Sequence, residues 1–320
     1  MSVRIVASAY ALPAASASVA ELAVRGALNS DPALLERFGF ERVHTATHES
    51  PYELACAAAA DVLARAETDP ASIDLLVYGG PQGPTAFTCA PSALASSAAH
   101  RTMARFDFPG TRLQHELGLD RAMVLGVDHL ACTTLLGAVR VARALMLAEG
   151  LDSALCVCGD FFPADAGREA IWNCTSDAGV AVLLERAAGA GRIVSSAHVT
   201  KGYYWNADER RNEMVAAYFP TSAHVIARVL ESAGWAAGDV DWIVPHNVSL
   251  RSWDVLRPLC GLAGTRIWDA NIARVGHTLA GDNFINLADA LAAGDVLTGQ
   301  KLLLFSYGYG AHWTALAVEA

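Results

Sequence analysis

Charged residues are scarce in this 320-residue chain, and they form no basic cluster. Lys, Arg, Asp and Glu make up 18% of the residues, the formal net charge is −10 and the sequence pI is about 5.4. A nucleic-acid surface needs concentrated positive charge, so the composition excludes that class of partner. A local arginine patch could still receive an acidic carrier protein, because composition says nothing about small patches.

Signals for membrane insertion and export are also absent. No uninterrupted apolar run reaches the length that a bilayer span requires. Residues 1–6 lead straight into a predicted strand and lack the apolar h-region of a signal peptide. The sequence therefore predicts a cytoplasmic protein with no membrane partner.

A disulfide framework and a serine-hydrolase motif are missing as well. The seven cysteines are odd in number and widely spaced, which disfavours paired disulfides. No G-x-S-x-G-type segment occurs, which argues against an α/β-hydrolase-like thioesterase. Cys156 and Cys158 lie together on a predicted strand, and we expect both to be structural. No metal site is expected.

The chain does contain an alternation of apolar strands and amphipathic helices. Hydrophobic residues make up 53% of the sequence, enough for a large core. The pattern predicts an α/β protein with buried sheets, and a weak repeat divides it into halves at residues 1–190 and 191–320. Residues 202–220 are predicted to be a surface segment, either a lid or acceptor-binding loop or a plain solvated loop. The strands are expected at 3–9, 75–78, 122–127, 154–158, 179–184, 192–199, 242–244, 301–306 and 314–318, and the helices at 53–66, 134–148, 223–234, 250–259 and 283–293.

Cys132 is the strongest candidate for chemistry. A strand-like run stops at Asp128, a turn of small residues follows, and Cys132 opens a helical segment that continues to about Ala148. A thiol at the start of a buried helix meets free N–H groups and the positive end of the macrodipole, and both favour the thiolate. Cys132 is therefore a candidate nucleophile for acyl transfer, although buried cysteines are often inert.

Two further segments could supply partners for Cys132. His246 follows an apolar strand, at the kind of carboxyl end where catalytic groups gather in open α/β sheets. His277 and Asp282 lie in a glycine-flanked loop before another predicted helix. A structural role for His246 and a helix-capping role for Asp282 are the alternatives.

Alternating glycines separate the last two predicted strands. Gly308 and Gly310 allow close backbone approach and could aim N–H groups at an oxyanion. A tight turn between strands would explain the same pattern.

Taken together, these segments and their order resemble the thiolase superfamily, and within it the beta-ketoacyl-acyl-carrier-protein synthase III family. The resemblance runs over essentially the whole chain. Residues 128–132 with 137–138 resemble the nucleophile segment of that family, and residues 245–251 are similar to its Pro-His-Gln-Ala-Asn-Leu-Arg segment. Residues 176–183 are similar to its glycine- and aspartate-containing stretch, and residues 308–310 resemble its C-terminal glycine loop.

The resemblance implies a five-layered α-β-α-β-α thiolase fold built from two similar halves, and a homodimer. It also implies a ping-pong reaction, in which a thioester of a carrier protein or coenzyme A acylates Cys132 and an acceptor then attacks. No permanently bound cofactor is implied. Arg42 lies where the family has a stretch near its pantetheine tunnel; a surface salt bridge is the alternative role for Arg42.

The chain departs from the family at His277, which stands where the family has a catalytic Asn. A Cys-His-His set could still support decarboxylative condensation, because two neutral imidazoles can donate to an enolate oxygen. Alternatively, Asp282 could orient His246 as a general base for an oxygen, nitrogen or sulfur acceptor. A third possibility is an inactive partner subunit, which the presence of Cys132 and His246 disfavours. Since a carboxylate repels an enolate but stabilises an imidazolium, simple acyl transfer is preferred.

Overall fold

The frame of the protein is one continuous run of ten strands, which divides into two five-stranded sheets. The structure, a computed structural model, describes residues 2–80, 108–162 and 166–320. The sheets meet only at the starts of β1 and β10, where Arg4 pairs with Arg192. In spatial order, the first sheet holds β1 (Arg4–Ala11), β9 (Ala178–Glu185), β6 (Ser153–Asp160), β4 (Leu75–Gly79) and β5 (Met123–Val127), and the second holds β10 (Arg192–Thr200), β14 (His312–Glu319), β13 (Lys301–Gly308), β11 (Trp242–Val244) and β12 (Arg266–Ile267).

The two sheets share one topology. In each, the first strand in chain order lies at one end beside the fifth, and the fourth, second and third follow across the sheet. This repeat confirms the prediction of two similar halves. The predicted boundary at residue 190 falls in the connection between β9 and β10, and its status as a domain boundary stays a prediction.

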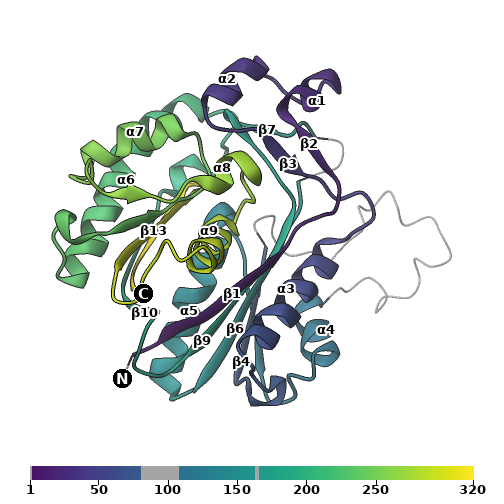
Figure 1. Cartoon of the computed structure of the whole chain (residues 1–320), viewed down its shortest axis with the longest axis vertical. Coiled ribbons are helices and arrows are strands. Elements are labelled where there is room, and N and C mark those ends of the chain that lie inside the picture. Colours follow the sequence, from purple (N-terminus) through teal and green to yellow (C-terminus); the bar gives the residue numbers. More distant parts are fainter. Residues whose placement is uncertain (1, 81–107, 163–165) are drawn as a thin grey trace.

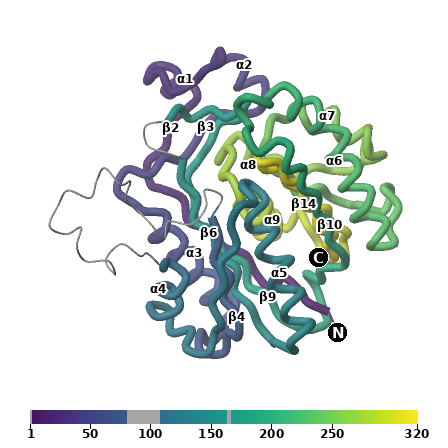
Figure 2. The backbone as a smooth tube through the Cα atoms, turned by 180° about the vertical axis from the view of Figure 1, so that it is seen from behind, coloured from purple at the N-terminus to yellow at the C-terminus, as the bar shows by residue number. Residues whose placement is uncertain are grey.

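Two helices lie between the sheets. Figures 1 and 2 show α5 (Thr134–Glu149) and α9 (Asp282–Ala292) in this central layer, with both chain termini at the same edge of the molecule. Leu135 and Met146 of α5 and Phe284 of α9 join one buried cluster with side chains from both sheets. Burial of such side chains is the main stabilising contribution to the core.

Outer helices cover the remaining face of each sheet (Figure 1). On the first sheet, α3 (Pro51–Arg65) packs through its alanine-rich face and α4 (Pro109–Glu116) lies beside it. On the second sheet, α6 (Arg211–Ala233) and α7 (Leu250–Leu259) pack through residues such as Val225 and Trp253. The layers run α-β-α-β-α, as predicted.

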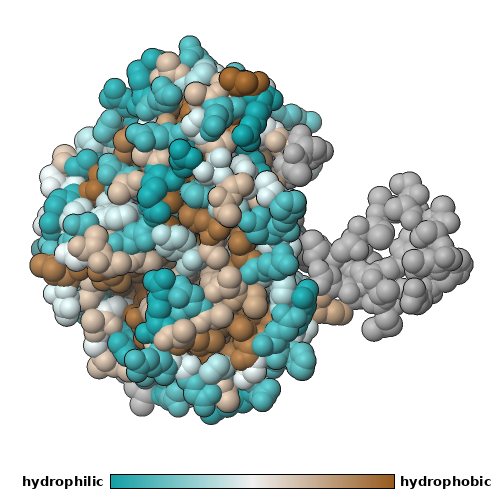
Figure 3. Space-filling model, turned by 45° about the vertical axis from the view of Figure 1, so that its right-hand side comes forward, coloured by the Kyte–Doolittle hydropathy of each residue, from teal (hydrophilic) through white to brown (hydrophobic). Residues whose placement is uncertain are grey.

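The stretch Ala131–Glu149 is, by length and hydropathy alone, compatible with a membrane span. Arg140 and Arg143 interrupt its apolar run, and eight residues of α5 are buried between the sheets. It is therefore a core helix. Figure 3 shows the outside of the molecule, where hydrophilic residues surround hydrophobic ones gathered near the middle of the face in view.

Several short strands and helices were not predicted from the sequence. Most lie around one end of the sheets: β2 (Ser16–Ser18), α1 (Val19–Val24), α2 (Pro32–Arg37), β3 (Arg42–His44), β7 (Glu169–Ala170), β8 (Asn173–Cys174) and α8 (Ala270–Arg274). The segment 202–220 lies mostly at the surface, as predicted, but only its first part is a loop, because α6 already begins at Arg211, well before the predicted start at residue 223, and contains Pro220. Cys89, in a segment that resembles the dimer-contact region of the synthase III family and to which no chemistry is assigned, lies outside the described residues.

The contact between α3 and β9 requires a glycine at position 179. A Cβ added there would lie 2.1 Å from the carbonyl carbon of Leu54, well inside van der Waals contact. We predict that Gly179→Ala lowers the free energy of unfolding by about 3 kcal/mol or more. Urea unfolding measures this, with Gly238→Ala as the control because an added Cβ there meets no atom within 4 Å. Equal unfolding midpoints for the two variants would contradict the packing described.

Candidate active site

Cys132 is presented by a sharp turn between β5 and α5. His129 and Ala131 have left-handed backbone angles, with φ of 58° and 45°, which non-glycine residues rarely adopt. Cys132 lies in the single 3-10 turn Ala131–Thr133, immediately before the helix, and is 8% exposed. The strand-to-helix placement predicted from the sequence is therefore present, with the sulfur just ahead of the first helical residue.

The end of β13 packs directly against this turn. A Cβ at Gly308 would lie 2.8 Å from the backbone nitrogen of Cys132 and 2.6 Å from the carbonyl oxygen of Leu130, so only glycine permits the approach. Ser306 Oγ donates to the carbonyl of Cys132 at 2.9 Å. Gly310 is placed differently: it has a φ of 116° and contacts His312 rather than the cysteine turn.

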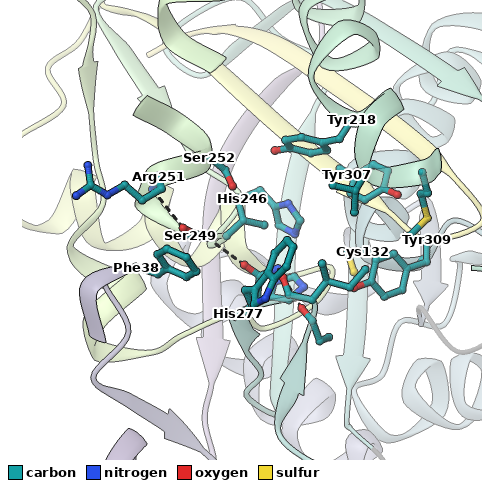
Figure 4. A pocket seen from close by; sticks show the side chains of 18 of the residues that line it. Phe38, Cys132, Tyr218, His246, Ser249, Arg251, Ser252, His277, Tyr307 and Tyr309 are labelled. Carbon is teal, nitrogen blue, oxygen red and sulfur yellow. Dashed lines mark hydrogen bonds between the residues drawn. The ribbon is translucent and has the colours of Figure 1, made fainter. Parts of the chain in front are cut away.

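Two histidines from the C-terminal half face Cys132 (Figure 4). His246 follows β11 and is 2% exposed, whereas His277 lies in the loop between α8 and α9 and is 4% exposed. One atom from each of the three side chains, the sulfur and a nitrogen of either ring, lies within 4.8 Å of the other two. The structure thus brings together three residues from sequence positions far apart.

Backbone hydrogen bonds hold His277 in place. Its N–H donates to the carbonyl of Cys174 at 2.8 Å, and its own carbonyl accepts from Ser176 N at 2.8 Å. These residues form a short parallel bridge through Thr175, so the loop after α8 is tied to the segment before β9. The imidazole of His277 consequently has a defined position between the two halves.

Asp282 is the buried carboxylate of the site. Its Oδ2 lies 2.7 Å from His277 Nδ1 and accepts from Asn247 N at 2.8 Å. Its Oδ1 accepts from both the backbone N–H and the hydroxyl of Thr278, at 2.6 and 2.7 Å. The side chain does not cap α9, since the N-cap residue is Gly281.

The carboxylate pairs mainly with His277, which differs from the pairing with His246 weighed in the sequence analysis. Asp282 Oδ2 is 3.6 Å from His246 Nε2, compared with 2.7 Å from His277 Nδ1. Neither ring nitrogen of His246 has a hydrogen-bond partner within the described part of the chain. The two imidazoles meet edge to face, with centroids 4.6 Å apart.

The two histidines of this cluster differ in protonation state. Burial lowers the pKa of His246 to about 3, and repulsion by His277 adds to this, so His246 is neutral. Burial alone would also lower the pKa of His277, but the interactions with Asp282 and with Cys132 raise it to about 10. Burial raises the pKa of Asp282, yet His277 holds it below the ordinary value. His277 and Asp282 therefore form an ion pair.

A pocket of about 460 Å³ opens onto the three residues. Its walls are largely apolar and aromatic, and Arg251 stands at the mouth with its guanidinium pointing away from His246 (Figure 4). Arg42 does not line this pocket; it is exposed on β3 and donates to Ser16 Oγ. The lining includes Phe38, Cys132, Phe162, Ile171, Trp172, Met214, Val215, Tyr218, Phe219, His246, Val248, Ser249, Arg251, Ser252, Val255, His277, Leu279, Tyr307 and Tyr309.

Sequence reasoning missed most of this lining. The segment 202–220 was a candidate acceptor-binding loop, and Met214 and Tyr218 from its helical part do line the pocket. Tyr307 and Tyr309 flank Gly308 and could have been noted as its neighbours. Cys132, His246 and His277 are also the only group of at least three His, Cys, Asp or Glu side chains in the described residues close enough to share a metal ion.

Comparisons with known proteins agree with this architecture. A sequence profile described as 3-Oxoacyl-[acyl-carrier-protein (ACP)] synthase III C terminal matches residues 230–320. A beta-ketoacyl-[acyl-carrier-protein] synthase III from Symbiobacterium thermophilum is 27% identical over 91% of this chain and 90% of its own length. A second such protein, beta-ketoacyl-[acyl-carrier-protein] synthase III 2 from Streptomyces coelicolor, is 29% identical over 65% of this chain and 66% of its own length.

Solved structures extend the similarity to the whole fold. The 3-oxoacyl-[acyl-carrier-protein] synthase III of Aquifex aeolicus superposes with a TM-score of 0.83, covering 99% of this chain and 100% of that chain at 19% identity. The shared fold, the synthase III relatives and the C-terminal profile together make this chain similar to the beta-ketoacyl-acyl-carrier-protein synthase III enzymes, with a thiolase-like fold.

Proposed function

We propose that the chain is an acyltransferase that forms an acyl-Cys132 thioester and passes the acyl group to an oxygen, nitrogen or sulfur acceptor without decarboxylation. The observation that carries this proposal is the buried carboxylate of Asp282, 2.7 Å from His277 Nδ1. A carboxylate in this position stabilises an imidazolium, and it repels the enolate that a decarboxylative condensation must form.

Before the first half-reaction, the proton of Cys132 already resides on His277, so the sulfur reacts as a thiolate. Because Nδ1 contacts Asp282, Nε2 is the nitrogen that faces the sulfur. The thiolate attacks the carbonyl carbon of the donor thioester. The oxyanion of the tetrahedral intermediate accepts a hydrogen bond from the backbone N–H of Cys132. Collapse breaks the donor C–S bond, and the leaving thiolate takes the proton from His277.

In the second half-reaction, the same imidazole acts as general base. Acylation removes the thiolate charge that helps to raise the pKa of His277, so the neutral imidazole becomes accessible. His277 accepts the proton of the acceptor while that group attacks the acyl carbonyl, and the C–S bond to Cys132 breaks. This assigns the base role expected for His246 to His277.

His246 has a different task in this scheme. It is neutral, buried and without a hydrogen-bond partner at either nitrogen among the described residues. A neutral imidazole can donate one hydrogen bond and accept another, so His246 can hold the carbonyl oxygen of the bound thioester. The missing side chain of Gly308 lets β13 approach Cys132 closely, whereas Gly310 lies in the turn after β13 and has no role in this scheme.

Condensation is the second candidate function. It is favoured by the mutual approach of Cys132, His246 and His277, because two imidazoles beside a sulfur could together bind an enolate oxygen. Against it stands the carboxylate of Asp282, because its negative charge repels the enolate that decarboxylation would form beside His277. An acceptor that loses a proton instead uses neutral His277 as its base, and Asp282 then stabilises the imidazolium that results.

The donor is an acyl thioester of coenzyme A or of a carrier protein, with no permanently bound cofactor. Arg251 supports this choice, since its side chain is 69% exposed at the pocket mouth and could meet a phosphate of either donor. The free, unpaired cysteines of the described chain fit the reducing cytoplasm.

Intact mass spectrometry tests the acyl-enzyme. After incubation with acetyl-, malonyl- and longer acyl-thioesters, we expect a single adduct on Cys132, with the malonyl group retained. Cys132→Ala should remove the adduct, and Cys260→Ala, which changes another free cysteine, should keep it. Loss of carbon dioxide with a lengthened product would support condensation instead, and no adduct from any thioester would contradict both functions.

The ion pair predicts a pH-dependent effect of Asp282→Asn. Loss of the carboxylate lowers the pKa of His277, so the protonated imidazole that pairs with the thiolate is lost near neutral pH. Acyl transfer should fall at least about 100-fold. Iodoacetamide labelling of Cys132 should become slower at about pH 7 and recover as the pH rises, whereas the unmodified chain should vary little.

Asp289→Asn is the matched control, because this carboxylate lies on the same helix but bonds Tyr10 and Asn271 away from the sulfur. Thermal unfolding of both variants separates loss of chemistry from loss of fold. Identical labelling profiles for Asp282→Asn and the unmodified chain would show that the carboxylate does not control the thiolate.

We also propose a homodimer formed through the edge strand β5. In the described residues this strand pairs only with β4, and it exposes Met123 at 40%. The adjacent helix α5 exposes Val141 and Leu147, which extends the apolar surface. Unpaired apolar edges favour pairing with a second chain.

Light scattering after gel filtration should give twice the mass of one chain. Met123→Lys should shift the protein toward monomer because it buries a charge at the interface, and Leu297→Lys, at an exposed site distant in sequence, should not. A monomer for the unmodified chain would refute the dimer.

A further inference from the structure

The pocket contains a hydroxyl group that the protein itself leaves unused. Tyr218 lines the wall opposite the loop of His277, and its Oη is buried without a hydrogen-bond partner in the described structure. Tyr307 Oη, on the strand that ends at Gly308, is likewise buried without a hydrogen-bond partner in the described residues. Buried polar groups are normally paired, so such hydroxyls lining a binding pocket point to a missing ligand group.

Aromatic packing, rather than hydrogen bonding, fixes these rings. Tyr218 meets Phe219 edge to face with centroids 5.0 Å apart, and it meets Tyr307 in the same way at 5.2 Å. Tyr307 in turn packs on Trp313 at 4.9 Å. The position of the Tyr218 hydroxyl is therefore set before any ligand arrives, as in a preorganised binding site.

The surroundings of Tyr218 define what its hydroxyl can bind. Neighbouring parts of the pocket wall are apolar and include Val215, Val248 and Val255, which offer a water molecule few partners. Figure 4 shows the hydroxyl end of Tyr218 directed across the pocket toward the side of Ser252 and His246. Burial raises the pKa of Tyr218, so the group is a neutral donor suited to a carbonyl or hydroxyl oxygen.

We infer that the acceptor carries, besides its nucleophilic group, a separate hydroxyl or carbonyl oxygen, which accepts a hydrogen bond from Tyr218 Oη while the nucleophilic group lies beside His277. The inference rests on the proposed acyl transfer and adds the class of acceptor: a molecule that has a nucleophilic group and a separate oxygen function. Tyr218 makes no bond to the acyl carbon, and the transferred proton goes to His277. Tyr218 is thus a specificity-determining residue.

The partner of the Tyr218 hydroxyl is better assigned to the acceptor than to the acyl donor. The donor departs as a thiol after the first half-reaction, and the acyl-cysteine must then be protected from water until the acceptor binds. An acceptor anchored at Tyr218 would occupy part of the apolar pocket of about 460 Å³ and displace water from beside the acyl-cysteine. A pocket that hydrogen-bonds a substrate oxygen also rejects analogues lacking that oxygen, because the buried hydroxyl is then left unpaired.

Binding can be measured without turnover. Ligand-observed NMR titrations of the full chain would compare cyclohexanol with the three positional isomers of cyclohexanediol, which differ from it by one hydroxyl. At least one diol should bind about tenfold or more tightly than cyclohexanol, and Tyr218→Phe should abolish that preference. Tyr203→Phe is the matched control, since its hydroxyl bonds Glu213 outside the pocket.

Transfer from the Cys132 adduct supplies the second readout. With an acyl-enzyme prepared from acetyl-coenzyme A, the preferred diol should be acylated faster than cyclohexanol, and Tyr218→Phe should reduce this step rather than Cys132 acylation. Equal affinity of all four probes, a preference that survives Tyr218→Phe, or a loss confined to acylation by the donor would overturn the inference. Absence of any Cys132 adduct would instead refute the proposed function, with the binding preference still measurable.

Discussion

The carboxylate of Asp282 is the interaction on which the site depends. It bonds the imidazole of His277, the backbone of Asn247 after β11 and both polar groups of Thr278, so one side chain ties together a strand end, a loop and the start of α9. A fully buried charge is tolerated only where hydrogen bonds and an opposite charge compensate it. Here that compensation also sets the protonation of the histidine beside the sulfur.

The repeated topology explains where these groups come from. Each half places a helix in the central layer after a strand of its own sheet: α5 follows β5, and α9 follows the loop of His277. Cys132 stands at the start of the first helix and Asp282 at the start of the second. Two equivalent positions of the duplicated fold have therefore acquired complementary roles, a nucleophile on one side and a charge partner on the other.

Much of this could be predicted from the sequence, and the exceptions have physical causes. The strand Trp242–Val244 and the helix Leu250–Leu259 match their predicted bounds because their apolar spacing is regular. The pairing of Asp282 with His277 rather than with His246 could not be predicted. It depends on the distance of Asp282 Oδ2 from each ring, 2.7 Å to His277 Nδ1 and 3.6 Å to His246 Nε2. The early start of α6 was missed because Pro220 and a polar first turn hide its helical pattern.

The close approach of Gly308 to Cys132 has a consequence for the newly made chain. The cysteine comes from the first half, whereas Gly308, both histidines and Asp282 come from the second. During synthesis, the first half emerges with a thiol that has neither its base nor its electrostatic partner, and such a thiol is a poor nucleophile at neutral pH. The full nucleophilic strength of Cys132 therefore requires that the second half has folded against the first, with Gly308 beside the cysteine turn and His277 beside the sulfur.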